Sequence, residues 1–273
     1  MKFIHYSVDN SSYIGLIIDG KIYRTKYRNI EELFNVDVFK DNLELEKSII
    51  KELPIIECPK QDILCLGMNY YEHKNECIDA GLDNDSKISS VYFSKRCTKA
   101  ITNNDYIDLH KDITSFVDYE GELGIILKKD LYKPLSNKEI EDSIFGYIII
   151  NDISARDIQK DHKQFYFGKS LDTFTSLSSV LVTKDEFSFP IKASIKTYVN
   201  GELRQNDNTE NMIFDTIYFL KELSSGITLK SGTIIATGTP SGVGKSLNKP
   251  LKDKDTVLIE ISGIGSLKNI CKE

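Results

Sequence analysis

Hydrophobic and polar residues alternate over several short stretches near the N-terminus. Residues 3–8 and 13–18 have the spacing of two short β-strands, and Asp19-Gly20 predicts a turn into a third segment at 21–23. From about residue 30 to residue 39 the apolar positions follow a helical period and predict an amphipathic helix. The N-terminal part of the chain is therefore expected to be a small unit of strands and one helix.

Two apolar runs in the middle of the chain predict strands of a buried sheet. Residues 124–127 follow Glu120-Gly121-Glu122-Leu123, and residues 144–150 are rich in β-branched side chains. The second run ends abruptly at Asn151-Asp152. A buried strand that ends in this way brings a carboxylate to the end of the sheet.

The C-terminal half also favours strands. Val199-Asn200-Gly201-Glu202 predicts a type I′ hairpin turn, because Asn and Gly tolerate the positive φ angles that this turn requires. Residues 257–261 predict a late strand, and residues 212–223 predict one amphipathic helix. Strands do not alternate regularly with helices, so the pattern predicts a β-rich α+β fold and not a βαβ repeat.

The chain length suits one large domain with a small additional unit. Pro54 and Pro59 interrupt the pattern around residue 57, between the N-terminal strands and the rest of the chain. We therefore predict a small N-terminal α/β domain at 1–57 and a larger domain at 58–273.

Two carboxylates lie two residues apart at the start of the first buried run. In a strand, Glu120 and Glu122 point to the same face, and two like charges on a buried face repel unless a cation compensates them. With Asp152 they offer oxygen ligands of the kind that Mg²⁺ prefers, with Mn²⁺ and Ca²⁺ as alternatives. Ordinary solvated acids at strand ends would give the same spacing. The residues alone leave these two interpretations open.

A second candidate pair follows an expected strand end at Leu66-Gly67. His73 and Glu76 are three residues apart, so on a helix they share a face and can form a hydrogen bond. A carboxylate that orients an imidazole fixes its tautomer and raises its basicity, as a general base requires. A surface His–Glu pair without a function is the alternative.

Composition and charge exclude several classes of protein. The chain has 273 residues and a formal net charge of −6, which argues against a nucleic-acid-binding surface. No apolar stretch is long enough to span a membrane, and the first residues lack a signal-peptide core, so we expect a cytoplasmic protein. The five cysteines have no C-x-x-C spacing, which disfavours a disulfide framework or a zinc site. Cys65 is expected to be a buried thiol, with a catalytic cysteine as the minor alternative.

The segment from Pro240 to Ser246 nearly matches a phosphate-binding P-loop. The required first glycine is replaced by Thr239, and Pro240 lacks an N–H group that could bind a phosphate. We therefore do not expect nucleotide hydrolysis.

Several motifs together resemble the fumarylacetoacetate hydrolase family, in the same order along the chain and from about residue 60 to the end. They are Gly67-x-Asn69-Tyr70-x-x-His73-x-x-Glu76, Asp118-Tyr119-Glu120-Gly121-Glu122-Leu123, Asn151-Asp152-x-Ser154-Ala155-Arg156-Asp157-x-Gln159, Gly168-Lys169-Ser170-x-Asp172-Thr173-Phe174, Val199-Asn200-Gly201-Glu202, Gly238-Thr239-Pro240-Ser241-Gly242-Val243-Gly244 and Ile264-Gly265-x-Leu267-x-Asn269.

The resemblance implies a fold, an assembly and a set of site residues. The fold would be the family's mixed β-roll or barrel-like C-terminal domain, usually as a homodimer. In this sequence, the matching metal ligands are Glu120, Glu122 and Asp152, the matching catalytic residues are His73, Glu76 and Lys169, and the matching substrate-binding residues are Lys95, Arg156, Gln159 and Thr239. His73 and Glu76 would lie on a segment that closes over the substrate, and Arg96 could select a dianion.

The resemblance also implies the chemistry. A small 2-oxo or 2,4-dioxo acid would bind Mg²⁺, and the metal would stabilise an enolate. Hydrolysis of an acylpyruvate or decarboxylation of oxaloacetate is the leading expectation. Isomerisation of an unsaturated hydroxy-dioate, or tautomerisation of oxaloacetate, is the alternative on the same site. The segment 161–167 lies where substrate specificity varies in the family, but its sequence does not identify the substrate.

Overall fold

The computed structural model describes residues 1–36, 38, 42–79 and 89–273. A twelve-stranded sheet forms most of the molecule. In pairing order it contains β4 (Glu44–Leu45), β3 (Lys21–Arg24), β2 (Ser11–Ile18), β1 (Lys2–Val8), β14 (Val180–Thr183), β11 (Ile144–Asp152), β10 (Gly121–Leu127), β17 (Ile234–Ala236), β6 (Ile63–Gly67) and β7 (Val91–Lys95), while β5 (Lys51–Glu52) pairs with β1 and β13 (Thr175–Leu177) with β11. As described, this sheet has open edges at β4 and β7 and does not close into a barrel.

A second sheet of five strands packs against the middle of the first. Its order is β16 (Glu202–Asn208), β15 (Ser194–Val199), β18 (Thr256–Ile261), β19 (Gly265–Lys272) and β8 (Tyr106–Asp108), and a short pair joins β9 (Val117–Asp118) to β12 (Ser154–Ala155). Buried side chains from β10 and β11, including Ile125 and Ile149, meet Ile195 and Ile259 of the second sheet in one core. The predicted β-rich α+β class is confirmed.

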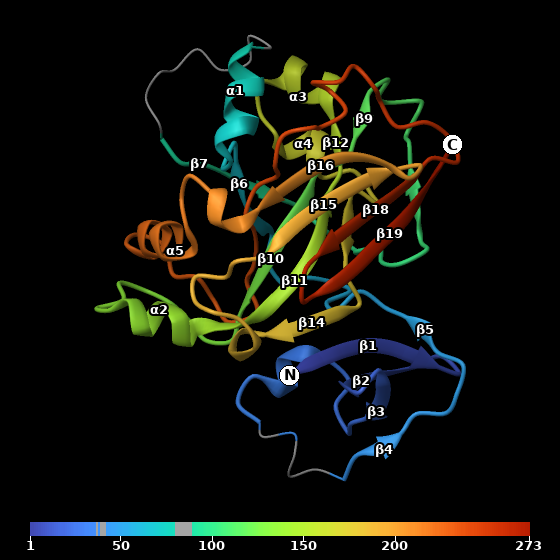
Figure 1. The fold of residues 1–273 in the computed structure, drawn as a ribbon, viewed down its shortest axis with the longest axis vertical. Helices are drawn as coiled ribbons and strands as arrows, with labels where there is room; N and C mark the ends of the chain where they lie inside the picture. Colours follow the sequence, from blue (N-terminus) through green and yellow to red (C-terminus); the bar gives the residue numbers. More distant parts are fainter. Residues whose placement is uncertain (37, 39–41, 80–88) are drawn as a thin grey trace.

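Short helices connect the strands. They are α1 (Tyr71–Asp79), α2 (Asn137–Ser143), α3 (Arg156–His162), α4 (Tyr166–Lys169) and α5 (Thr216–Ser224), with 3₁₀ helices at Ile30–Leu33, Lys184–Glu186 and Thr209–Asn211. Figure 1 shows α1, α3 and α4 together at one end of the molecule and β1–β5 at the other. Within the described ranges, no helix is long and apolar enough to cross a membrane.

The N-terminal strands are confirmed, and they continue the larger sheet. β1 pairs with β2 on one side and with β14 on the other, so this segment is joined to the rest by backbone hydrogen bonds. A separate core, which includes Phe3, Leu16 and Phe145, lies beneath them. Since β1 and β14 belong to one sheet, the pairing of the strands does not mark a boundary between two domains. The boundary at residue 57 stays a prediction.

Both predicted helices differ in extent from those observed. The helix expected at 30–39 is a 3₁₀ helix at Ile30–Leu33 that Asn29 caps, and residues 37 and 39–41 lie outside the described residues. The helix expected at 212–223 begins at Thr216, where the Asp215 side chain accepts a hydrogen bond from the Tyr218 N–H. The predicted start at residue 30 is correct, whereas the start predicted at residue 212 was imprecise, because the capping side chain of Asp215, and not the apolar period, decides where that helix begins.

The hairpin prediction is confirmed in detail. Asn200 and Gly201 have φ angles of 52° and 80°, and they join β15 to β16.

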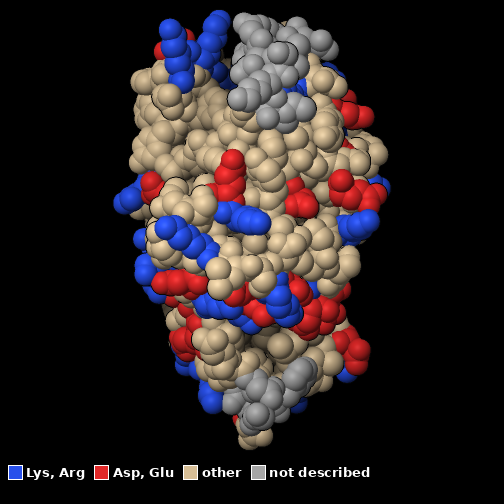
Figure 2. Space-filling model, turned by 90° about the vertical axis from the view of Figure 1, so that its left-hand side faces the viewer, with Lys and Arg blue, Asp and Glu red and all other residues tan. Residues whose placement is uncertain are grey.

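Acidic and basic side chains are interspersed on the face shown in Figure 2, with a band of both signs across its lower half.

Candidate active site

The three predicted metal-binding acids lie together at the ends of two neighbouring strands. Glu120 directly precedes β10, Glu122 lies on it, and Asp152 ends the antiparallel β11. The Asp152 N–H donates to the Glu120 carbonyl oxygen at 2.9 Å, which fixes the register of the two strand ends. One oxygen of each carboxylate lies within 4.8 Å of the others, and all three residues are buried. The alternative of solvated strand-end acids is therefore wrong.

The glycine between the two glutamates faces the second sheet. A Cβ atom at Gly121 would lie 2.3 Å from Thr197 Oγ1, and the Gly121 N–H donates to Gln205 Oε1 at 3.1 Å. The close approach at this glycine is thus made by β15 and β16. Packing on one face of β10 holds the carboxylates on the other face in place.

Basic side chains of the protein already neutralise two of the three acids. Lys169 Nζ lies 2.7 Å from Glu120 Oε2 and 2.6 Å from Asp152 Oδ2. Lys95 Nζ lies 2.6 Å from Asp152 Oδ1, and Arg156 Nη1 lies 2.6 Å from Glu120 Oε1. Burial alone would raise the pKa of Glu120, but the charges of Lys169 and Arg156 outweigh it and lower that pKa to about 2.

Glu122 has a different environment. Its Oε2 accepts a hydrogen bond from the Gly238 N–H at 2.8 Å, and no ion pair in the described part of the chain reaches it. Burial, together with repulsion from Asp152 and Glu120, raises its pKa well above the usual range. A dication at this position would compensate the one carboxylate that the protein's own cations leave uncompensated.

The donor set fits a hard divalent cation. Three carboxylates supply only oxygen ligands, and neither histidine nor cysteine contributes to the cluster. Oxygen-only sites suit Mg²⁺, Mn²⁺ or Ca²⁺ better than softer metals. Glu120, Glu122 and Asp152 would hold such an ion.

The predicted His–Glu pair is present on α1. His73 Nδ1 lies 3.2 Å from Glu76 Oε2, and the Gly242 N–H donates to Glu76 Oε1 at 2.9 Å. Burial raises the pKa of Glu76, but the hydrogen bonds from His73 and Gly242 outweigh it and keep that pKa below its usual value. Glu76 is therefore an ionised partner that orients the imidazole.

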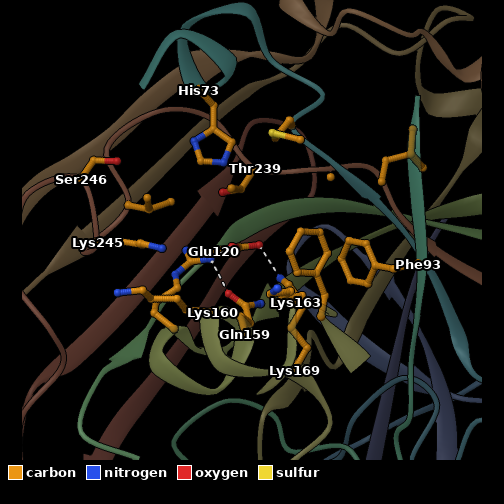
Figure 3. A pocket seen from close by; sticks show the side chains of 16 residues that line it. His73, Phe93, Glu120, Gln159, Lys160, Lys163, Lys169, Thr239, Lys245 and Ser246 are labelled. Atoms are coloured by element: carbon orange, nitrogen blue, oxygen red, sulfur yellow. Dashed lines mark hydrogen bonds and ion pairs between the residues drawn. The ribbon is translucent and has the colours of Figure 1, made fainter. Parts of the chain in front are cut away.

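A cavity of about 510 Å³ lies between Glu120 of the triad and His73 of the His–Glu pair. Figure 3 shows His73 on one side of Glu120 and Lys169 on the other. The wall is formed by Leu66, Gly67, Met68, His73, Phe93, Glu120, Arg156, Gln159, Lys160, Lys163, Phe165, Lys169, Thr239, Val243, Lys245 and Ser246. Residues far apart in the sequence thus meet in one pocket, where strand ends meet α1, α3 and α4.

Three of the four predicted substrate-binding residues line this cavity, and the fourth does not. Gln159, Arg156 and Thr239 are in its wall, and Thr239 Oγ1 donates to the Gly121 carbonyl oxygen at 3.0 Å. Lys95 is 1% exposed and lies behind Asp152, with its ammonium also 3.2 Å from the Ile153 carbonyl oxygen. Its position suits charge compensation and not substrate contact. Arg96 is also outside the cavity wall and pairs with Asp62 at the surface.

Sequence reasoning missed the role of Asp118. Its carboxylate accepts from Arg156 Nε at 2.8 Å and from the N–H groups of Gly244 and Lys245 at 2.7 and 2.9 Å. It therefore joins α3 to the segment at residues 238–246, here called the Gly-rich loop. These N–H groups bind a side chain of the protein itself, which agrees with the expectation that the loop is not a P-loop. The signal was present in the sequence, since Asp118 begins the motif that contains Glu120 and Glu122.

Cys65 is confirmed as a buried thiol without a catalytic environment. It is 1% exposed, and burial and the charges of Asp152 and Glu122 raise its pKa well above the usual range. A thiol in these surroundings is a poor nucleophile.

Comparison with known proteins agrees with this geometry. Residues 62–271 match the family model described as fumarylacetoacetate (FAA) hydrolase C-terminal. The chain is 36% identical to oxaloacetate tautomerase YisK of Bacillus subtilis, with 98% of this chain and 99% of the relative covered. Among solved structures, the fumarylacetoacetate hydrolase EaFAH of Exiguobacterium antarcticum has a TM-score of 0.88 at 36% identity, covering 100% of this chain and 99% of that one.

An isomerase has the same fold. The 2-hydroxyhepta-2,4-diene-1,7-dioate isomerase of Mycobacterium marinum gives a TM-score of 0.75 at 26% identity, covering 100% of this chain and 98% of that one. The family model covers most of the chain, and the similar proteins that carry a named activity are enzymes. The chain belongs to the fumarylacetoacetate hydrolase family and is an enzyme.

Proposed function

We propose that this enzyme interconverts the keto and enol forms of a small 2-oxo acid with the help of a divalent cation, and that oxaloacetate is the first substrate to test. The observation that carries the proposal is a buried carboxylate triad whose member Glu120 lines the same cavity as His73, the imidazole that Glu76 orients. The similarity of nearly the whole chain to an oxaloacetate tautomerase supports it.

Two buried donors at the cavity are available for the substrate's carboxylate. In the described structure, Arg156 Nη2 and Gln159 Nε2 have no hydrogen-bond partner, although both atoms are buried. An unpaired buried donor costs about 1–3 kcal/mol, so a ligand that accepts from it gains that amount. A carboxylate next to the 2-oxo group would satisfy both donors, with Thr239 on the opposite wall.

A cation held by the triad, most simply Mg²⁺, would polarise the 2-oxo carbonyl and make the protons at C3 more acidic. Mn²⁺ and Ca²⁺ are the alternatives that the same oxygen ligands allow. Glu122 determines the affinity, because it is the ligand whose charge the protein leaves uncompensated.

His73 moves the proton. The imidazole, oriented through Nδ1 by Glu76, takes a proton from C3 through Nε2 as the C2=C3 double bond forms. The imidazolium then gives this proton to the oxygen at C2, which yields the enol without any net gain or loss of atoms. The reverse sequence returns the keto acid.

Lys169 stabilises charge and does not exchange its proton. Burial would lower its pKa, but the attraction of Asp152 and Glu120 outweighs burial and raises it above the ordinary value. Its ammonium therefore remains protonated beside the oxygen that gains negative charge during proton transfer.

Cleavage of a C–C bond is the second candidate. Hydrolysis of an acylpyruvate or decarboxylation of oxaloacetate would use the same enolate-stabilising site, and the similarity to EaFAH supports it. These reactions were the leading expectation from the sequence.

Proton NMR in D₂O tests the two candidates. The purified protein is incubated with oxaloacetate and with acetylpyruvate, once with Mg²⁺ and once with EDTA. Mg²⁺-dependent deuterium exchange at C3 or faster keto–enol interconversion, without pyruvate above the enzyme-free rate, supports the tautomerase. Pyruvate formed above that rate identifies cleavage, and a spectrum identical to the enzyme-free control overturns both candidates.

We further propose that the enzyme acts in the cytoplasm as a homodimer on a small molecule, without a nucleic-acid or membrane partner. The net charge of −6 supports the absence of a nucleic-acid partner.

A further inference from the structure

The wall of the active-site cavity is basic, although the chain as a whole is acidic. Five cationic side chains line it, Arg156, Lys160, Lys163, Lys169 and Lys245, and Glu120 is the single acidic residue among the described lining residues. The formal net charge of the chain is −6, so this concentration of positive charge does not follow from composition. It favours anionic ligands.

The five cations form an inner and an outer group. Arg156 and Lys169 form ion pairs with the buried acids at 2.6–2.8 Å and belong to the charge balance of the triad. Lys160 and Lys163, on α3 and directly after it, are exposed, and in the described structure neither takes part in an ion pair. Lys245 approaches from the Gly-rich loop, and Figure 3 labels all three lysines around the cavity.

We propose that Lys160, Lys163 and Lys245, here called the cationic rim, bind a second carboxylate of the substrate at the end away from the 2-oxo group. The inference rests on the proposed function and specifies its substrate class: dianionic 2-oxo diacids are preferred over monoanionic 2-oxo acids. It also replaces Arg96, which lies outside the cavity wall, as the selector of a dianion.

Two substrates that share the 2-oxo end and differ in the charge at C4 provide the test, because comparing their ratio across variants cancels their different intrinsic reactivity. Oxaloacetate is a dianion at neutral pH, and its 4-methyl ester has the same 2-oxo end but a single negative charge. The rate of enol-to-keto conversion is measured for both with the wild type and with Lys160→Gln/Lys163→Gln. The quantity compared is the ratio of kcat/KM for the diacid to kcat/KM for the ester.

We expect the double variant to lower this ratio by about 10-fold, through a higher KM for the diacid, since partly exposed ion pairs are weak individually. The control variant Lys252→Gln/Lys254→Gln removes the same two charges at an exposed turn and should keep the wild-type ratio. Lys160→Glu, made in parallel, should lower the ratio further. It replaces the double variant as the test if the double variant folds poorly.

The outcomes separate the two proposals. If the wild type converts oxaloacetate and the ratio is the same in all variants, the cationic rim has no role in selection and the inference is overturned. If the wild type converts neither compound, the proposed function fails, and the inference fails with it.

Discussion

At the scale of single residues, the site is a balance of buried charges. Among the residues that the structure describes, lysine or arginine nitrogens lie 2.6–2.7 Å from Glu120 and Asp152, whereas Glu122 accepts only the Gly238 N–H, at 2.8 Å. Glu120, which directly precedes β10, and Glu122, which lies on it, therefore have pKa values shifted in opposite directions. This asymmetry makes Glu122 the residue whose replacement is most informative.

Glu122→Gln should weaken divalent-cation binding without weakening the fold. The change removes a charged ligand, so the loss of Mg²⁺ affinity should exceed the roughly 10–100-fold typical of changes to groups that only support the ligands. In EDTA the thermal midpoint should stay the same or rise, because the variant replaces a carboxyl group whose ionisation burial, Asp152 and Glu120 all disfavour by a neutral amide of the same size. Titration calorimetry and thermal unfolding measure the two effects.

Glu260→Gln is the control, because this glutamate is exposed on β18. Mg²⁺ affinity that is equal in Glu122→Gln and in the wild type would contradict the assignment of the metal site.

At the scale of elements, loops and helix ends are joined to the sheets by single carboxylates. Asp118 is buried and connects β9 to α3 and to the Gly-rich loop through Arg156, Gly244 and Lys245. The same loop holds Glu76 through Gly242. The positions of the His73–Glu76 pair on α1 and of Arg156 on α3 therefore depend on one loop.

Asp118→Asn should loosen this loop. Replacing a buried, charged acceptor of four hydrogen bonds by a neutral amide is expected to cost about 2–4 kcal/mol of stability. Amide hydrogen exchange of residues 242–246 should accelerate, and KM should rise because Arg156 loses one of its two carboxylate partners and keeps only Glu120. Asp130→Asn, at an exposed Lys230 pair, is the matched control. Unchanged exchange at Gly244 and Lys245 would show that Asp118 does not hold the loop.

The N-terminal strands have a comparable connection at Glu46. Its Oε2 accepts from Tyr6 of β1 at 3.0 Å and from Arg24 Nε of β3 at 2.8 Å, and its side chain is 3% exposed. Burial would raise the pKa of Glu46, but the Ser48 N–H and Arg24 outweigh it and lower it to about 2.

This shift predicts the acid sensitivity of the N-terminal segment. The pKa of Glu46 is lower in the folded chain than in the unfolded chain, so its contribution is complete above about pH 4.5 and is lost as the pH falls toward 2. Glu46→Gln should therefore be less stable than the wild type by about 1–3 kcal/mol at pH 7, and the difference should shrink between pH 4.5 and 2. Urea unfolding across this range measures it, and a constant difference would contradict the account.

At the scale of the whole molecule, sequence patterns predicted the elements better than their packing. The strands around Glu120 and Asp152 and the turn at Asn200-Gly201 were correct, because alternation, buried runs and turn chemistry are local properties. The pairing of β1 with β14 and of β8 with β19 joins distant segments, and no local pattern contains that information.

In the active site, too, local features could be predicted from the sequence and contacts between distant segments could not. The spacing of the acids indicated a shared face, but their compensation by Lys95, Lys169 and Arg156 depends on three other segments of the chain. The family motifs identified these residues as candidates. For Lys95, however, the motif match did not predict where the side chain lies. A residue can match a motif and still lie behind the site and not in its wall.

A homodimer is the predicted assembly, from the resemblance of the motifs to the family. Size-exclusion chromatography with light scattering should give a mass of twice 31.0 kDa for the purified chain. A single species of 31.0 kDa at micromolar concentration would contradict the prediction.

The metal dependence of tautomerisation tests the central claim most directly. Enol oxaloacetate is mixed with the enzyme, and its conversion to the keto form is followed by absorbance, first with Mg²⁺ and then after addition of excess EDTA. The account predicts acceleration over an enzyme-free Mg²⁺ control, loss of at least about 100-fold of that rate in EDTA, and recovery when Mg²⁺ is restored. A rate that EDTA leaves unchanged, or that never exceeds the enzyme-free control, would contradict the assignment of the buried triad as the catalytic metal site.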